Sequence, residues 1–141
     1  MRIRPWATLT TDLPDDHIED DHDIIQYGGK SVVKAIGEIL VRLGCEVEEP
    51  VYADEHGWEI YITVKKRRLW CQVTLIDKFL ILLKQNSWVA NAFHPRHPVY
   101  IEILSRLALE LDADPRFHEV RWFTGAEVDT AFPGTEHPVE I

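Results

Sequence analysis

A chain of 141 residues, 45% of them hydrophobic and 28% charged, is long enough to form one domain with a buried core, so fibrous and wholly disordered proteins are excluded. The net charge of -9 disfavours general nucleic-acid binding, and every apolar run is far shorter than the roughly 20 residues of a membrane span. The first residues lack the apolar segment of a secretory signal, and we therefore expect a cytoplasmic protein that does not bind membranes.

The segment 12–23 contains seven carboxylates, two histidines and no lysine or arginine. The other 17 acids and 15 bases of the chain nearly cancel, so most of the net charge lies in this segment. Such a charge density favours basic partners through long-range attraction. We predict that residues 1–28 are an acidic leader, a short helix or partly disordered, and that residues 29–141 form a single domain. The partner-binding acids predicted in the leader are Asp12, Asp15, Asp16, Glu19, Asp20, Asp21 and Asp23.

His17 and His22 are weak candidates for metal ligands in the same segment. On a helix they would point about 140° apart, whereas zinc-binding helices place two histidines four residues apart. The segment also lacks the glycine and the final glutamate of a calcium-binding loop. We therefore predict no metal site and no cofactor.

Residues 31–43 are predicted to form a helix, because apolar side chains recur at spacings of three and four. On the opposite side Lys34, Glu38 and Arg42 form a charge ladder that is typical of a solvated face, and Gly44 provides a stop.

The sequence GGKS at the start of this helix resembles the end of a phosphate-binding loop. That motif requires another glycine five residues before Gly29, and Ile24 stands there. The glycines therefore indicate a turn before the helix. Whether the helix N-terminus also binds an anion stays open.

Four antiparallel strands are predicted at residues 46–53, 58–65, 68–76 and 79–84, because apolar and polar residues alternate and the breaks are short enough for hairpins. The turn at 65–68 has the sequence KKRR. It could bind phosphate, but a solvated turn, or one paired with the acidic leader of the same chain, is the commoner meaning.

Cys45 and Cys71 stand among apolar neighbours in these strands, which indicates buried structural thiols, while a disulfide between them stays open.

Residues 98–111 are predicted to form a second, more buried helix, and residues 117–123 a fifth strand. The predicted fold class is α+β: a helix, a four-stranded antiparallel meander, a helix and a short fifth strand, with the helices packed on one face of the sheet.

The other face of this sheet is too aromatic for a plain solvated surface, and we predict that it binds a partner. The alternative, that residues 85–97 or the C-terminal tail cover it, stays open. The residues predicted on this face are Tyr52, Tyr61, Trp70, Thr74 and Leu82.

No catalytic pattern emerges, so we favour a small non-enzymatic protein-binding domain with a protein partner or a second copy. In size, acidity and helix-meander-helix order the chain resembles small secretion chaperones and toxin-immunity proteins, although its element order departs from that of the secretion chaperones. The resemblance rests on no motif and implies no residue role. The alternatives are a metal-dependent hydrolase or a homodimer of unknown ligand. The hydrolase would combine acids with His17, His22, His94 or His97.

Overall fold

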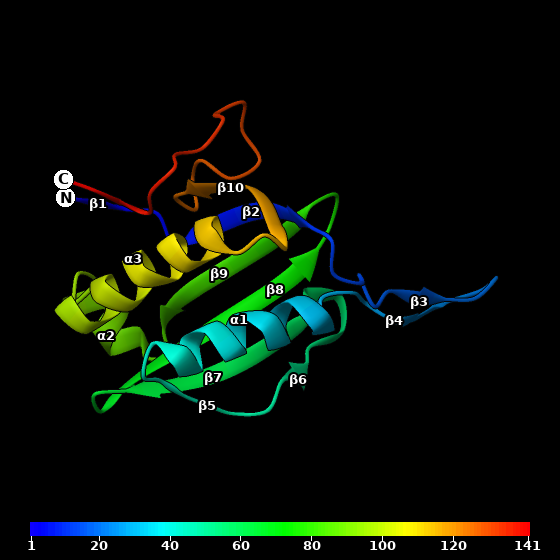
Figure 1. Cartoon of the computed structure of the whole chain (residues 1–141), viewed down its shortest axis with the longest axis horizontal. Coiled ribbons are helices and arrows are strands. Elements are labelled where there is room, and N and C mark those ends of the chain that lie inside the picture. The colour runs from blue at the N-terminus through cyan, green and yellow to red at the C-terminus, as the bar shows by residue number, and fades with distance from the viewer.

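A seven-stranded antiparallel sheet with helices on one face forms the body of the chain in the computed structural model, which describes residues 1–141 (Figure 1). The strand order is β10-β2-β9-β8-β7-β5, and the short β6 also pairs with β7. The strands are β2 (Trp6–Thr11), β5 (Glu46–Val47), β6 (Val51–Tyr52), β7 (Trp58–Val64), β8 (Arg67–Leu75), β9 (Phe79–Gln85) and β10 (Phe117–Phe123). The predicted α+β class with an antiparallel sheet is confirmed.

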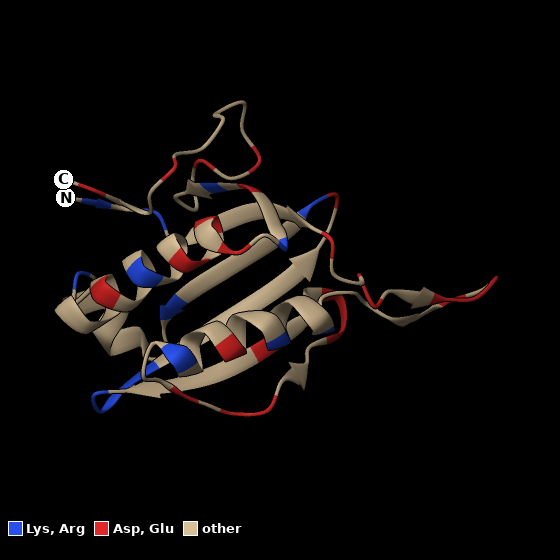
Figure 2. Cartoon of the chain, in the orientation of Figure 1, with Lys and Arg blue, Asp and Glu red and all other residues tan.

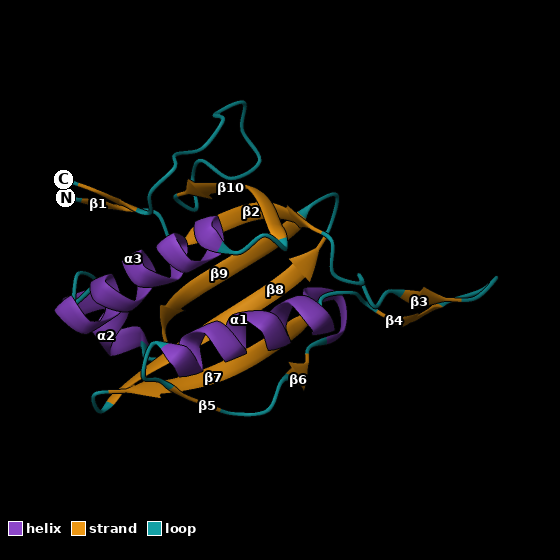
Figure 3. Cartoon of the chain, viewed as in Figure 1, coloured by secondary structure: helices purple, strands orange, loops and turns teal.

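Three helices accompany the sheet, namely α1 (Lys30–Arg42), α2 (Trp88–Phe93) and α3 (Pro98–Ala113). Helices α1 and α3 lie side by side on the same face of the sheet (Figure 3). Helix α1 contacts β5, β7 and β8, whereas α3 contacts β9 and β10. A 3-10 turn, η1 (Asp54–His56), precedes β7. None of the helices has the length and apolar character required to cross a lipid bilayer.

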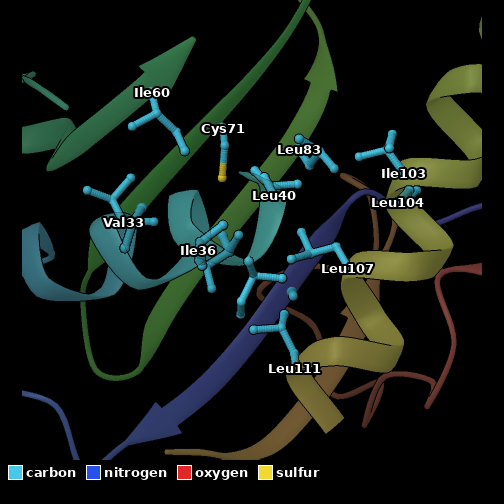
Figure 4. Packing of buried hydrophobic residues seen from close by; sticks show 14 of the residues in the cluster. Val33, Ile36, Leu40, Ile60, Cys71, Leu83, Ile103, Leu104, Leu107 and Leu111 are labelled. Atoms are coloured by element: carbon cyan, nitrogen blue, oxygen red, sulfur yellow. The ribbon is translucent and has the colours of Figure 1, made fainter. Parts of the chain in front are cut away.

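The core lies between the two long helices and the sheet, in one cluster of 29 buried residues (Figure 4). The apolar spacing of α1 brings Val33, Ile36 and Leu40 into this layer, and α3 contributes Leu104 and Leu107. Burial of the apolar faces of the helices against the apolar face of the sheet is the main source of the folding stability of the domain.

Both cysteines are free and buried. Burial raises the pKa of the Cys71 thiol to about 12, so this thiol is protonated at neutral pH.

The strand order differs from the predicted meander in two places. The predicted strand 46–53 is interrupted, since Glu48–Pro50 separate β5 from β6 and Pro50 has no backbone N–H to donate. The unpredicted β2 lies between β9 and β10, so the fifth predicted strand does not continue the meander. Strand β2 contributes only Ala7 and Leu9 to the core, which is too short an apolar pattern to identify from sequence.

Residues 1–28 contain strands where the sequence suggested a short helix or partial disorder. In addition to β2, a two-residue strand β1 (Arg2–Ile3) pairs with β11 (Val139–Glu140) near the C-terminus. A separate hairpin, β3 (Ile18–Glu19) with β4 (Ile24–Gln26), projects away from the sheet (Figure 1). Strand β2 and the β1–β11 pair therefore connect this segment to the body of the domain.

Candidate functional site

The sheet face opposite the helices is the candidate surface that the sequence predicted. Along β7 and most of β8 the side chains alternate between buried, under the helices, and half-exposed on the opposite side. We call the latter side the open sheet face. Its residues in the four central strands are Trp6, Thr8, Glu59, Tyr61, Trp70, Gln72, Thr74, Leu80, Leu82 and Lys84.

Two rows of cross-strand neighbours give this face its apolar and aromatic character. In the first row the register places Tyr61, Trp70 and Lys84 next to one another across β7, β8 and β9. The second row crosses five strands and consists of Glu59, Gln72, Leu82, Trp6 and Phe123. Directly opposed side chains of this kind contact one another, so the two rows form one continuous surface.

Glu59 fixes the two aromatic side chains at the centre of the open sheet face. Its Oε2 atom accepts a hydrogen bond from Trp70 Nε1 at 2.5 Å and a longer one from the Tyr61 hydroxyl at 3.5 Å. Partial burial, and then the neighbouring Glu59 carboxylate, raise the pKa of Tyr61, so the phenol stays protonated. The surface is thereby pre-organised with its aromatic rings held in place.

The C-terminal tail covers the β10 side of this face and reaches Trp6 on β2, whose Nε1 atom lies 3.5 Å from the position of a Cβ atom on Gly125. Phe132 packs edge-on against Phe123, with ring centroids 6.1 Å apart. A Cβ atom on Gly134 would come within 2.8 Å of the Phe123 ring, so the tail crosses β10 closely and requires a glycine there. The segment 85–97 forms α2 instead, and its Trp88 and Phe93 point into solvent. Over β7 and β8 the surface remains accessible.

Tyr52 does not belong to the open sheet face, although the sequence analysis placed it there. It is directly opposite Trp58, a helix-side residue, and the two rings are 5.1 Å apart. Its hydroxyl accepts a hydrogen bond from the Tyr27 backbone N–H at 2.9 Å. The interruption of the predicted strand at Glu48–Pro50 explains the change of face, because alternation cannot be extended across a break.

Four exposed acids lie on the β3–β4 hairpin, which we call the acidic arm (residues 17–27). Glu19, Asp20, Asp21 and Asp23 form no ion pair with a lysine or arginine, and only His17 lies near Glu19, at 3.6 Å. Backbone N–H groups of His22 and Asp23 donate to the Asp20 carboxylate and lower its pKa. This carboxylate therefore also shapes the tip of the arm.

Of the other three acids of the segment, Asp12 and Asp16 contact the body through their carboxylates, whereas the Asp15 carboxylate binds locally. Asp12 lies 2.9 Å from the His118 ring, and Asp15 accepts a hydrogen bond from the His17 backbone. Asp16 Oδ2 accepts from the Ser31 N–H at 2.6 Å, at the first turn of α1. The sequence analysis left open whether an anion binds at the N-terminus of this helix, after the GGKS sequence. The Asp16 carboxylate of the same chain occupies that position.

The histidines do not converge. His17 and His22 lie on the acidic arm, whereas His94 and His97 lie between α2 and α3 at the opposite end of the molecule (Figure 1). No group of three His, Cys, Asp or Glu side chains is arranged to hold a metal ion.

A hollow of about 840 Å³ lies beside β1, the end of β9 and the start of α3. Its charged side chains are Arg2, Lys84, Arg96 and Glu140, and it contains no histidine or cysteine. The Tyr100 hydroxyl in its wall already donates to the Leu83 carbonyl at 2.6 Å. The hollow therefore lacks a paired nucleophile and base.

Comparisons with protein-family models, with curated proteins and with solved structures gave no match. The geometry of the chain itself is therefore the basis for a function.

Proposed function

We propose that this chain is a small non-enzymatic protein-binding domain that acts in the cytoplasm, and that its partner docks on the open sheet face. The observation that carries this proposal is the continuous surface around the half-exposed Tyr61 and Trp70 and the largely buried Leu82 beside them, on a sheet whose other face is packed by helices. Exposed apolar patches of this kind commonly mark protein interfaces.

The chemistry of the face suits a protein partner. Tyrosine and tryptophan are enriched among the residues that dominate binding energy, because they bury a large area and also carry a hydrogen-bonding atom. Since Glu59 already fixes the Trp70 indole, little side-chain entropy would be lost on docking.

The acidic arm favours a basic partner. Its four carboxylates, none of which pairs with a lysine or arginine, would accelerate the approach of a positively charged protein, an effect that salt weakens. The same charge repels phosphate backbones, so a nucleic acid is a poor candidate. A small acidic domain that binds a protein and performs no chemistry corresponds to an immunity-like or chaperone-like adaptor.

Site-specific photo-crosslinking in the native host tests this proposal. A photoreactive phenylalanine analogue at position 70 should give a defined protein adduct, whereas the same analogue at Leu109, an exposed apolar position on α3, should give none. A self-adduct at position 70, together with a dimer in light scattering, would indicate a homodimer as the partner. Equal labelling at both positions, or none at either, would contradict the proposal.

A further inference from the structure

The end of the molecule formed by α2 and the β7–β8 turn exposes large apolar side chains. Trp88 is 79% exposed and Phe93 71%, and Val89 is also exposed on the same short helix. The opposite side of α2 faces the body, since Ala90 is buried and the Asn91 amide donates to the Gln85 carbonyl at 2.8 Å. The aromatic side of α2 therefore has no partner within the chain.

Bases flank this aromatic side on both borders. One hollow beside α2 is lined by the turn residues 66–68, and the 840 Å³ hollow on its other side contains Lys84 and Arg96. Lys66, Lys84 and Arg96 are exposed and have no acidic partner. We call this surface the basic end; it consists of Lys66, Arg67, Lys84, Trp88, Val89, Phe93 and Arg96.

The acidic arm presents the complementary chemistry. Besides its four carboxylates, none of which pairs with a lysine or arginine, it exposes three isoleucines, Ile18, Ile24 and Ile25, which are between 42% and 58% exposed. Its two strands pair only with each other, so the outer edge of each strand is free.

The two surfaces lie at opposite ends of the molecule (Figure 2). The arm projects away from the body, so a chain does not place its own arm on its own basic end. The KKRR turn is consequently not paired with the acidic segment of the same chain, as the sequence analysis had left open. Its Lys65 and Arg68 instead pair with Glu102 and Glu48, each at 3.3 Å.

We propose that the chain self-associates head to tail, with the acidic arm of one copy docked on the basic end of the next. Both surfaces combine exposed apolar side chains with unpaired charge, and the charges are opposite in sign. Because the contact joins two different surfaces, it is heterologous and generates a ring or an open chain of copies. This association uses neither Tyr61 nor Trp70, but it shares Lys84 with the open sheet face and the acidic arm with the proposed function.

A charge-swap experiment tests the association. The arm variant carries Glu19→Lys, Asp21→Lys and Asp23→Lys, and leaves Asp20 in place because it shapes the tip. The end variant carries Lys66→Glu, Lys84→Glu and Arg96→Glu, and leaves the paired Lys65 and Arg68 unchanged. Sedimentation velocity then measures the mass of each variant alone and of the equimolar mixture.

The intact protein should form oligomers at ~0.01 M salt and lose them at ~1 M, where the Debye length falls from about 30 to 3 Å. Each variant alone should be monomeric, because its two ends carry the same charge. The mixture should regain oligomers, because each arm then meets an end of opposite charge. Monomers throughout, or oligomers in either variant alone, would overturn the proposal.

Two controls separate this proposal from others. The variant Tyr61→Ser, Trp70→Ser should assemble like the intact protein, so failure of the sheet-face proposal leaves this result unaffected. Vesicles of phosphatidylcholine and phosphatidylserine test an anionic membrane as the occupant of the basic end. Monomeric protein that sediments with these vesicles, and an end variant that does not, would assign the surface to lipid and reject self-association.

Discussion

Single carboxylates in the acidic segment have different tasks, which the sequence could not separate. Asp16 caps α1 from a distance of 15 residues along the chain, and Asp12 pairs with His118 across 106 residues. Contacts between residues so far apart in the sequence depend on the tertiary structure. The sequence alone therefore predicts one continuous acidic surface for the whole run of acids. Glu59 is a similar case, since its bond to Trp70 depends on the β7–β8 register.

Asp16 is expected to stabilise the start of α1. Gly29, at the N-cap position, has no side chain, and Asp16 Oδ2 accepts the Ser31 N–H in its place. Asp16→Ala should therefore lower the free energy of unfolding by about 1 kcal/mol in urea denaturation. Asp16→Asn should lose less, because asparagine keeps an acceptor and tolerates the positive φ of 64°. An unchanged midpoint for the alanine variant would show that the carboxylate does not act as a cap.

Acid sensitivity is expected from Glu127. The buried Arg4 guanidinium donates to this carboxylate at 2.8 Å, and the pKa of Glu127 falls from 4.5 to about 2. Because the unfolded chain then binds more protons, the contribution of Glu127 to stability is complete above pH 4.5 and is lost as the pH falls toward 2. Thermal denaturation across this range should show a shallower decline for Glu127→Gln than for the intact protein.

Glu136→Gln, on the same tail but with a 3.6 Å contact to an exposed arginine, is the matched control. An identical pH profile for Glu127→Gln and the intact protein would contradict the assignment.

At the scale of elements, strong periodicity was sufficient to predict α1, α3, β7, β8, β9 and β10. These segments bury one face, and burial of one face leaves a period of two or 3.6 in the sequence. Strands β2, β5 and β6 are short and their pairing is set by distant partners, so the strand order could not be predicted. The open sheet face was predicted for Tyr61, Trp70, Thr74 and Leu82, because alternation within a continuous strand fixes the side, and it failed for Tyr52 beyond a break.

Strand β2 is expected to be essential to the domain, in contrast to the arm. Leu9 is fully buried between β9 and β10, so Leu9→Ala should cost about 2–5 kcal/mol through lost contacts and a cavity. Ile25→Ala on the exposed arm should change stability by less than about 0.5 kcal/mol. Urea denaturation of both variants measures the difference. Equal effects would mean that the N-terminal strand is not part of the packed sheet.

At the scale of the whole molecule, three surfaces remain without a partner inside the chain: the open sheet face, the acidic arm and the basic end. The acidic arm and the basic end lie at opposite ends of the long axis of the molecule (Figure 2). The net charge of -9 does not reveal this arrangement, because a sum over the whole chain says nothing of where its charges lie. The basic end could not be predicted from sequence, since the KKRR turn and α2 come together only through the β8–β9 pairing.

The central claim, that the open sheet face binds a protein, is tested most directly by quantitative affinity capture from the native host. The intact protein is compared with Tyr61→Ser, Trp70→Ser and with Trp88→Ser, Phe93→Ser, a matched pair of aromatic losses elsewhere on the surface. We predict that one protein is captured by the intact and α2 variants and is reduced at least about tenfold, or ~1.4 kcal/mol, by the sheet-face variant. Equal capture by all three proteins would contradict the claim.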